Sequence, residues 1–134
     1  MDTISEADRS ALMGRIRSKN TRPEIAVRSI LHRLGYRFRL HRKDLPGCPD
    51  IVLPKYRKII LVHGCFWHGH TCRLASKPKS NQEYWTAKIK SNQVRDARNL
   101  DILRREGWRV LEIWECEVRV VDGLMEKLMT FMQS

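Results

Sequence analysis

The stretch that decides the fold is Lys58–Cys72, which reads Lys-Ile-Ile-Leu-Val-His-Gly-Cys-Phe-Trp-His-Gly-His-Thr-Cys. Its first half is apolar and rich in β-branched residues, which predicts a buried strand. Its second half gathers three His, two Cys and a Phe-Trp pair. Soft metal ligands, proton carriers and large aromatic side chains rarely crowd together without a functional reason. We therefore take the strand end and the loop after it as the candidate site.

The charge balance indicates a polyanionic partner. The 134 residues carry 26 Lys+Arg against 15 Asp+Glu, for a net charge of +11, and such a surface binds nucleic acid through its phosphates. No apolar run approaches the ~20 residues of a membrane-spanning helix, and the N-terminus does not resemble a signal peptide. We expect a cytoplasmic, nucleoid-associated protein without a membrane partner. Its four Cys then indicate metal ligands or thiols more than disulfides.

Outward from this stretch, the pattern predicts a mixed β-sheet flanked by helices, an α/β (α+β) fold in one domain over residues 1–134. Thr21-Arg22-Pro23-Glu24 is a capping box that begins a helix ending before Gly35. Ser80 and Glu83 form a second box. Helices are expected over 5–17, 22–34, 82–106 and 122–132, and strands over 36–41, 50–53, 56–62 and 108–115. The buried positions of the second and last helices are expected to be Ile25, Val27, Ile30, Leu31, Leu34, Leu124, Leu128, Met129 and Phe131.

A closed zinc site is predicted from the Cys and His residues of the loop. Cys65, Cys72 and one histidine are close in sequence, and Cys116 follows the last strand. Three thiolates and one imidazole complete tetrahedral zinc, so the metal would be structural. Spacing alone does not decide between His68 and His70 as the fourth ligand. The alternative is that these Cys are small buried hydrophobic residues. Cys48 is given no ligand role.

The catalytic candidates lie at the neighbouring strand ends. Metal-dependent nucleases of the restriction type place an Asp at such a strand start and an acid-x-Lys triplet on the next strand. Asp50 matches the first, and it offers a hard oxygen ligand for Mg²⁺, with the Val62 main-chain carbonyl as a supplement. The triplet position reads Leu61-Val62-His63, so the second acid is missing and His63 replaces Lys. The non-zinc histidine would also handle protons. Glu24 could orient a histidine or serve only the helix cap.

Three segments together resemble the very short patch repair (Vsr) endonuclease family. They are Leu45-Pro46-Gly47-x-Pro49-Asp50-Ile51-Val52, Val62-His63-Gly64-Cys65-Phe66-Trp67-His68-Gly69-His70-x-Cys72, and Gly107-Trp108-Arg109-Val110-Leu111-x-Ile113-Trp114-Glu115-Cys116. The resemblance implies a restriction-endonuclease-like core and a Mg²⁺-dependent nick 5′ to the T of a T·G mismatch, which arises when 5-methylcytosine deaminates. It assigns Mg²⁺ to Asp50, proton handling to His63 and His68, and zinc to Cys65, His70, Cys72 and Cys116. Val62 and Cys48 depart from residues that some members carry there.

DNA contacts are expected from three places. The basic arm at residues 1–20 offers Arg15, Arg17 and Lys19, although a charge run is often just a solvated face, and the family resemblance implies that Met13 from the same arm joins the aromatic wedge of Phe66 and Trp67. Phe66 and Trp67 could wedge between base steps, which a mismatch makes cheaper to unstack; packing of Trp67 on the sheet is the alternative. The long helix offers Lys88, Asn92 and Arg95. Asn92 and Asp96 interrupt its apolar stripe, as buried polar groups or DNA contacts.

Three functional classes are compatible with these residues. The preferred one is a monomeric nickase acting on double-stranded DNA with a T·G mismatch, with mismatch-repair accessory proteins as further candidate partners. A restriction-like or homing enzyme that cuts both strands could use the same fold, but no feature clearly encodes dimerisation. A zinc-dependent DNA-binding module without catalysis is the third. An RNA-binding protein is disfavoured because aromatic-rich platform strands are lacking.

Overall fold

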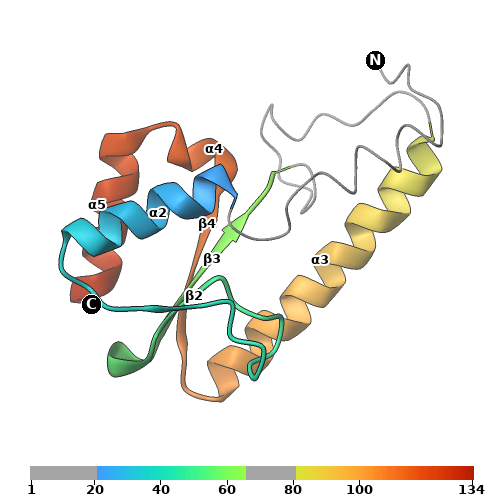
Figure 1. The fold of residues 1–134 in the computed structure, drawn as a ribbon. Coiled ribbons are helices and arrows are strands. Elements are labelled where there is room, and N and C mark those ends of the chain that lie inside the picture. Colours follow the sequence, from blue (N-terminus) through green and yellow to red (C-terminus); the bar gives the residue numbers. More distant parts are fainter. Residues whose placement is uncertain (1–20, 66–80) are drawn as a thin grey trace.

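The structure is a computed structural model that describes residues 21–65 and 81–134 (Figure 1). In this part of the chain the elements follow in the order α2 (Arg22–Arg33), β1 (Arg39–Leu40), β2 (Ile51–Leu53), the 3-10 helix η1 (Pro54–Tyr56), β3 (Lys58–His63), α3 (Gln82–Arg105), β4 (Arg109–Trp114), α4 (Glu115–Val118) and α5 (Val121–Gln133). The helix expected over 5–17 and the loop after Cys65 lie outside the described residues.

The four strands form one mixed sheet in the order β1-β2-β3-β4. β1 with β2 and β2 with β3 are antiparallel, whereas β3 and β4 are parallel. The helix α3 lies in the connection between the two parallel strands, as the sequence predicted. The mixed sheet with flanking helices is therefore confirmed.

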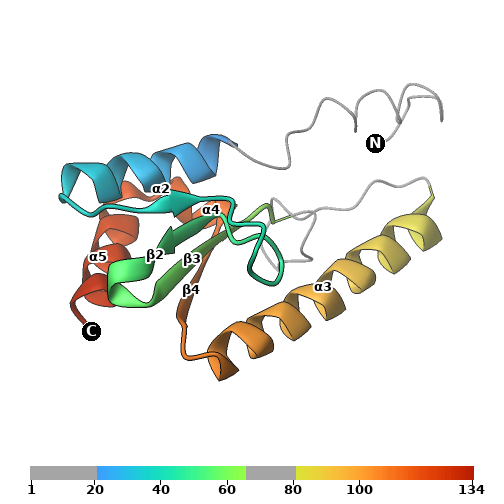
Figure 2. The ribbon, with the colours of Figure 1, turned by 60° about the horizontal axis from the view of Figure 1, so that its bottom comes forward.

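Both faces of the sheet are covered, which explains why β2 is buried along its whole length. Helices α2 and α5 lie on one side of the sheet and α3 runs across the other (Figure 2). Alternate strand residues point to opposite faces. The α2/α5 side holds a core of Val27, Ile30, Leu31, Ile51, Leu53, Ile60, Ile113, Leu124, Leu128 and Met132. The α3 side holds Val52, Ile59, Leu103 and Trp108.

Truncation of a fully buried residue in the larger core should cost much of the stability. Leu31 is 0% exposed, so Leu31→Ala removes buried methyl groups and leaves a cavity, at an expected cost of about 2–5 kcal/mol in the free energy of unfolding. Leu40→Ala, at a site 38% exposed, is the control and should change it by about 0.5 kcal/mol. Denaturant unfolding measures both. Equal losses in the two variants would contradict this packing.

Helix α2 begins and ends where its sequence signals predicted. The Thr21 hydroxyl accepts a hydrogen bond from the Glu24 backbone N–H, and Gly35 takes φ +87° just beyond the C-cap. Left-handed backbone of this kind is favourable for glycine after a helix. The expected burial of Ile25 was wrong, because its side chain is 46% exposed.

Other boundaries moved by a few residues. The strand expected over 36–41 is regular only at Arg39–Leu40. Tyr36 and Phe38 are half-buried as the alternation predicted, whereas Leu40 is exposed. The N-cap of α3 is Asn81 rather than Ser80. Met129 was expected in the core but is 40% exposed, and Met132 is buried instead. The short helix α4, which carries Cys116, was not predicted.

Lys58 begins β3 with a buried ammonium group. Its side chain is directed at the end of α5, where Nζ donates to the carbonyl oxygens of Phe131 (2.7 Å), Met132 (3.0 Å) and Ser134 (3.0 Å). Burial lowers the pKa of Lys58. This contact ties the start of β3 to the last turn of the chain. None of the helices in the described ranges has the length and apolarity needed to cross a membrane.

Candidate active site

Asp50 lies immediately before β2 and is bonded to the end of β3. Its Oδ2 accepts the backbone N–H of Val62 at 2.9 Å. The backbone pairing of β2 with β3 ends at the Ile51–Ile60 pair. The Val62 N–H lies beyond that pair, and the Asp50 carboxylate supplies its acceptor. The antiparallel arrangement therefore brings Asp50 to the residue next to His63, as expected for an acid at a strand start opposite the end of the next strand.

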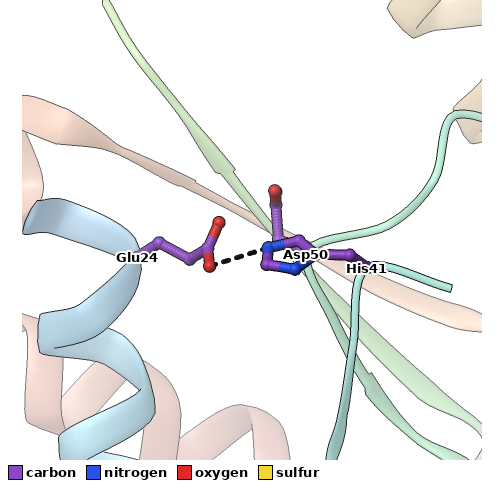
Figure 3. Close-up of side chains that lie close together, drawn as sticks. All are labelled: Glu24, His41 and Asp50. Carbon is purple, nitrogen blue, oxygen red and sulfur yellow. Dashed lines mark hydrogen bonds and ion pairs between the residues drawn. The ribbon is translucent and has the colours of Figure 1, made fainter. Parts of the chain in front are cut away.

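Three potential ligand groups meet at this point (Figure 3). One ligand atom from each of Glu24, His41 and Asp50 lies within 4.8 Å of the others. Glu24 comes from the first turn of α2 and is 1% exposed. Its Oε2 lies 2.9 Å from Nε2 of His41, and the Arg28 guanidinium one turn along α2 pairs with the same carboxylate. Two carboxylates and one guanidinium leave one net negative charge when His41 is neutral.

The backbone places His41 beside Asp50. The His41 N–H donates to the Asp50 carbonyl at 3.1 Å, which extends the β1/β2 pairing by one residue. His41 has φ 46°, a left-handed conformation that is uncommon for residues other than glycine. Such backbone strain is often found at functional sites. The sequence had marked His41 only as the end of an alternating strand.

Glu24 takes part in the helix cap through its backbone and in the cluster with His41 and Asp50 through its side chain. Its backbone N–H is held by Thr21, while its carboxylate contacts Arg28 and His41. The sequence allowed either a structural or a functional role. The buried carboxylate beside Asp50 is compatible with both roles.

His63 ends β3 and is 6% exposed. Its Nε2 lies 2.9 Å from Oε2 of Glu112 on β4, and its ring packs on Trp114 with centroids 4.8 Å apart. The hydrogen bond from His63 holds the pKa of the Glu112 carboxyl below its usual value, although partial burial acts in the opposite direction. Sequence reasoning missed Glu112, because its pairing with His63 depends on the register of two strands separated by α3.

Two of the four expected zinc ligands are neighbours. The Cys116 N–H donates to Sγ of Cys65 at 3.4 Å, and the Cys65 N–H donates to the Glu115 carboxylate at 3.4 Å. These contacts join the end of β3 to the start of α4. The other two expected ligands, His70 and Cys72, lie outside the described residues.

The expected DNA contacts are described only on α3. Lys88 and Arg95 are exposed on that helix, whereas Asn92 is 6% exposed. Burial of Asn92 favours the structural alternative for this residue. The remaining sequence-predicted site residues lie outside the described ranges; they are Met13, Arg15, Arg17, Lys19, Phe66, Trp67 and His68.

Comparison with known proteins gives consistent matches along the chain. A family described as DNA mismatch endonuclease Vsr matches residues 1–74. The type II nicking enzyme V.XorIIP of Xanthomonas oryzae pv. oryzae is 56% identical over 127 residues, which cover 95% of this chain and 93% of that protein. V.NmeAIP of Neisseria meningitidis serogroup A, also a type II nicking enzyme, is 43% identical over 88% of this chain and 84% of its own length. The DNA mismatch endonuclease Vsr of Escherichia coli is 40% identical over 96% of this chain and 83% of its own length.

Proposed function

The chain belongs to the Vsr family of DNA mismatch endonucleases, and on that premise we propose that it nicks one strand of duplex DNA 5′ to the T of a T·G mismatch. Such mismatches arise by deamination of 5-methylcytosine, and the nick would begin very short patch repair. The naming of two relatives as nicking enzymes supports cleavage of one strand. The net charge of +11 supports a DNA substrate.

The observation that carries this proposal is the Asp50 carboxylate at the end of β3, with Glu24 and His41 beside it. Carboxylate oxygens are the ligands Mg²⁺ prefers, and it keeps several waters when few protein groups bind it. The donor set therefore fits a divalent cation held by Asp50, with Glu24 and His41 in reach and the Val62 carbonyl as a further candidate. A bound cation would neutralise charge on the phosphoryl oxygens.

The histidines would handle the protons of phosphodiester hydrolysis. A water oxygen forms the new bond to phosphorus while the bond from phosphorus to the leaving oxygen breaks. One imidazole must take a proton from the water, and a second group must give a proton to the leaving oxygen. His63, next to the amide that Asp50 binds, is assigned to the water. His68, which the family resemblance names with His63 as a proton-handling residue, is assigned to the leaving group because His63 is assigned to the water.

The remaining parts would hold and deform the DNA. Zinc bound by Cys65, His70, Cys72 and Cys116 would fix the loop on a restriction-endonuclease-like core; the contact between Cys116 and Cys65 supports this set. Phe66 and Trp67, with Met13 from the arm, would then wedge into the mismatched step. Phosphate contacts are assigned to Arg15, Arg17, Lys19, Lys88 and Arg95.

Cleavage of end-labelled duplexes tests the proposal. Duplexes that differ only in a central T·G, U·G or T·A pair are incubated with the protein, with and without Mg²⁺. We expect a nick in the T-containing strand of the T·G duplex that requires Mg²⁺, and much slower cleavage of T·A, because a paired step resists unstacking. Equal cleavage of T·G and T·A would contradict mismatch specificity.

A supercoiled plasmid carrying one T·G mismatch separates nicking from double-strand cleavage. Open circles are the expected product. Linear plasmid as the first product would favour the restriction-like or homing alternative, and binding without cleavage would favour the non-catalytic zinc module.

A further inference from the structure

A carboxylate on the strand next to β3 lies against the imidazole assigned to the attacking water. In the parallel β3/β4 register, Glu112 is the partner of Leu61 and Trp114 is the partner of His63. Glu112 therefore shares the sheet face of His63 and lies one pleat before it. Its Oε2 is 2.9 Å from Nε2 of His63. A carboxylate therefore lies on the next strand beside Leu61, the position at which the restriction-type triplet carries its second acid.

The surroundings hold the His63 ring in one orientation. The ring is almost fully buried and packs on the Trp114 indole. The Glu112 side chain is 32% exposed, so it is more accessible to solvent than the imidazole that it contacts. Arg104 favours the ionised form of this carboxyl and Asp96 opposes it, while the hydrogen bond from His63 has the largest effect on its pKa and lowers it.

The hydrogen bond also decides which ring nitrogen carries the proton. An ionised carboxylate can only accept hydrogen bonds, so Nε2 of His63 is the donor. A neutral imidazole has one N–H, and its proton then lies on Nε2, which leaves the lone pair on Nδ1. In this tautomer Nδ1 is the nitrogen that can take a proton.

We propose that Glu112 is a positioning residue for His63, which fixes the Nε2–H tautomer and makes Nδ1 the proton acceptor for the attacking water. This inference rests on the proposed function for its assignment of His63 to the water. As the water oxygen bonds to phosphorus, its proton passes to Nδ1. The resulting imidazolium is stabilised by the Glu112 carboxylate through the Nε2–H bond. The same division of roles between a carboxylate and a histidine occurs in hydrolases with a Ser-His-Asp triad.

Glu112→Gln tests the catalytic consequence, because it removes the charge and keeps the shape. We expect the single-turnover rate of nicking on the T·G duplex to fall by at least about 10- to 100-fold, the scale of loss when the hydrogen-bonding partner of a metal-ligating histidine is removed, and by at most about 10⁴-fold, the loss when the Asp of a Ser-His-Asp triad becomes Asn. The dissociation constant for the same duplex without Mg²⁺ should stay within about 2-fold, because Glu112 is not assigned to DNA contact.

Glu117→Gln is the matched control. Glu117 has a similar exposure of 31% and pairs with a cation, Lys127, at 2.6 Å, but it has no histidine partner among the described residues. Its nicking rate should equal that of the wild type. An unchanged rate in Glu112→Gln would overturn the proposal. A rate loss matched by the control, or accompanied by an equal loss of DNA affinity, would also overturn it.

Nitrogen NMR of the resting protein tests the tautomer without any reaction. At about pH 8 an ordinary imidazole is neutral, and the ¹⁵N and ¹³C shifts of the ring report which nitrogen carries hydrogen. The His63 signals are identified by their loss in His63→Gln. We expect the Nε2–H form in the wild type and a mixture of forms in Glu112→Gln.

An Nδ1–H form in the wild type would overturn the positioning role even if nicking is seen. If the wild type does not nick T·G duplexes, the proposed function fails, while the NMR result still decides whether Glu112 sets the His63 tautomer. The two failures are therefore distinguishable.

Discussion

Asp50→Asn should abolish nicking while the protein still folds and binds DNA. The Asn side-chain oxygen can accept the Val62 N–H as Oδ2 of Asp50 does, so the end of the sheet should be preserved. The charge that would hold Mg²⁺ is lost, and we expect the single-turnover rate to fall by about 10³-fold, the scale on which loss of one electrostatic stabiliser slows an enzyme. Gel-shift affinity for the mismatched duplex should be equal to or higher than that of the wild type, because a negative charge has been removed.

Asp44→Asn provides the control for this substitution. Asp44 lies in the turn between β1 and β2, is 61% exposed, and pairs with Arg42. Its loss should leave the nicking rate unchanged. Nicking by Asp50→Asn at the wild-type rate would refute the assignment of Asp50 to the metal. If the variant instead stops nicking because it does not fold, as circular dichroism would show, the role of Asp50 is structural.

Removal of one proposed zinc ligand should destabilise the whole domain. We expect about one zinc per chain in the purified protein, bound in a closed four-ligand site. Cys116→Ser replaces a ligand whose backbone N–H already contacts Sγ of Cys65. Because structural zinc contributes about 10–16 kcal/mol of binding free energy in small domains, the variant should lose most of its zinc and unfold at a clearly lower temperature.

Cys48→Ser is the matched control. Cys48 is exposed and was assigned no ligand role, so its zinc content and unfolding temperature should equal those of the wild type. Elemental analysis after dialysis gives the zinc content, and thermal unfolding with and without a chelator gives its contribution. A wild-type protein free of zinc, or one whose unfolding is insensitive to chelation, would contradict the predicted site.

Local sequence signals predicted the elements well because each has a short-range physical cause. The capping residue Thr21 and the terminating Gly35 mark the two ends of α2, and the apolar run at 58–62 predicted the buried strand β3. The parallel pairing of β3 and β4 followed from the helix between them. Met129 and Met132 lie one turn apart on α5. Which of them is buried depends on the element packed against that helix, so it could not be predicted from the helix sequence alone.

The candidate site was predicted in part. Asp50, His63 and Glu24 were found because they lie in recognisable local motifs. His41 and Glu112 were missed because their importance comes from partners 17 and 49 residues away. A histidine in an alternating stretch, or a glutamate in a strand, gives no local sign of such a partner. Only the strand register and the approach of α2 to the end of the sheet reveal these pairs.

The buried ammonium of Lys58 links the last turn of α5 to the strand that carries His63. The strand that starts with Lys58 ends at His63, and its first residue is anchored by carbonyl oxygens of the final turn. An uncompensated charge in an apolar interior is very unfavourable. The carbonyl oxygens at the end of α5 compensate the Lys58 ammonium by accepting its hydrogen bonds. Loss of the last turn of α5 would therefore remove the partners of Lys58 at one end of β3, the strand whose other end is His63.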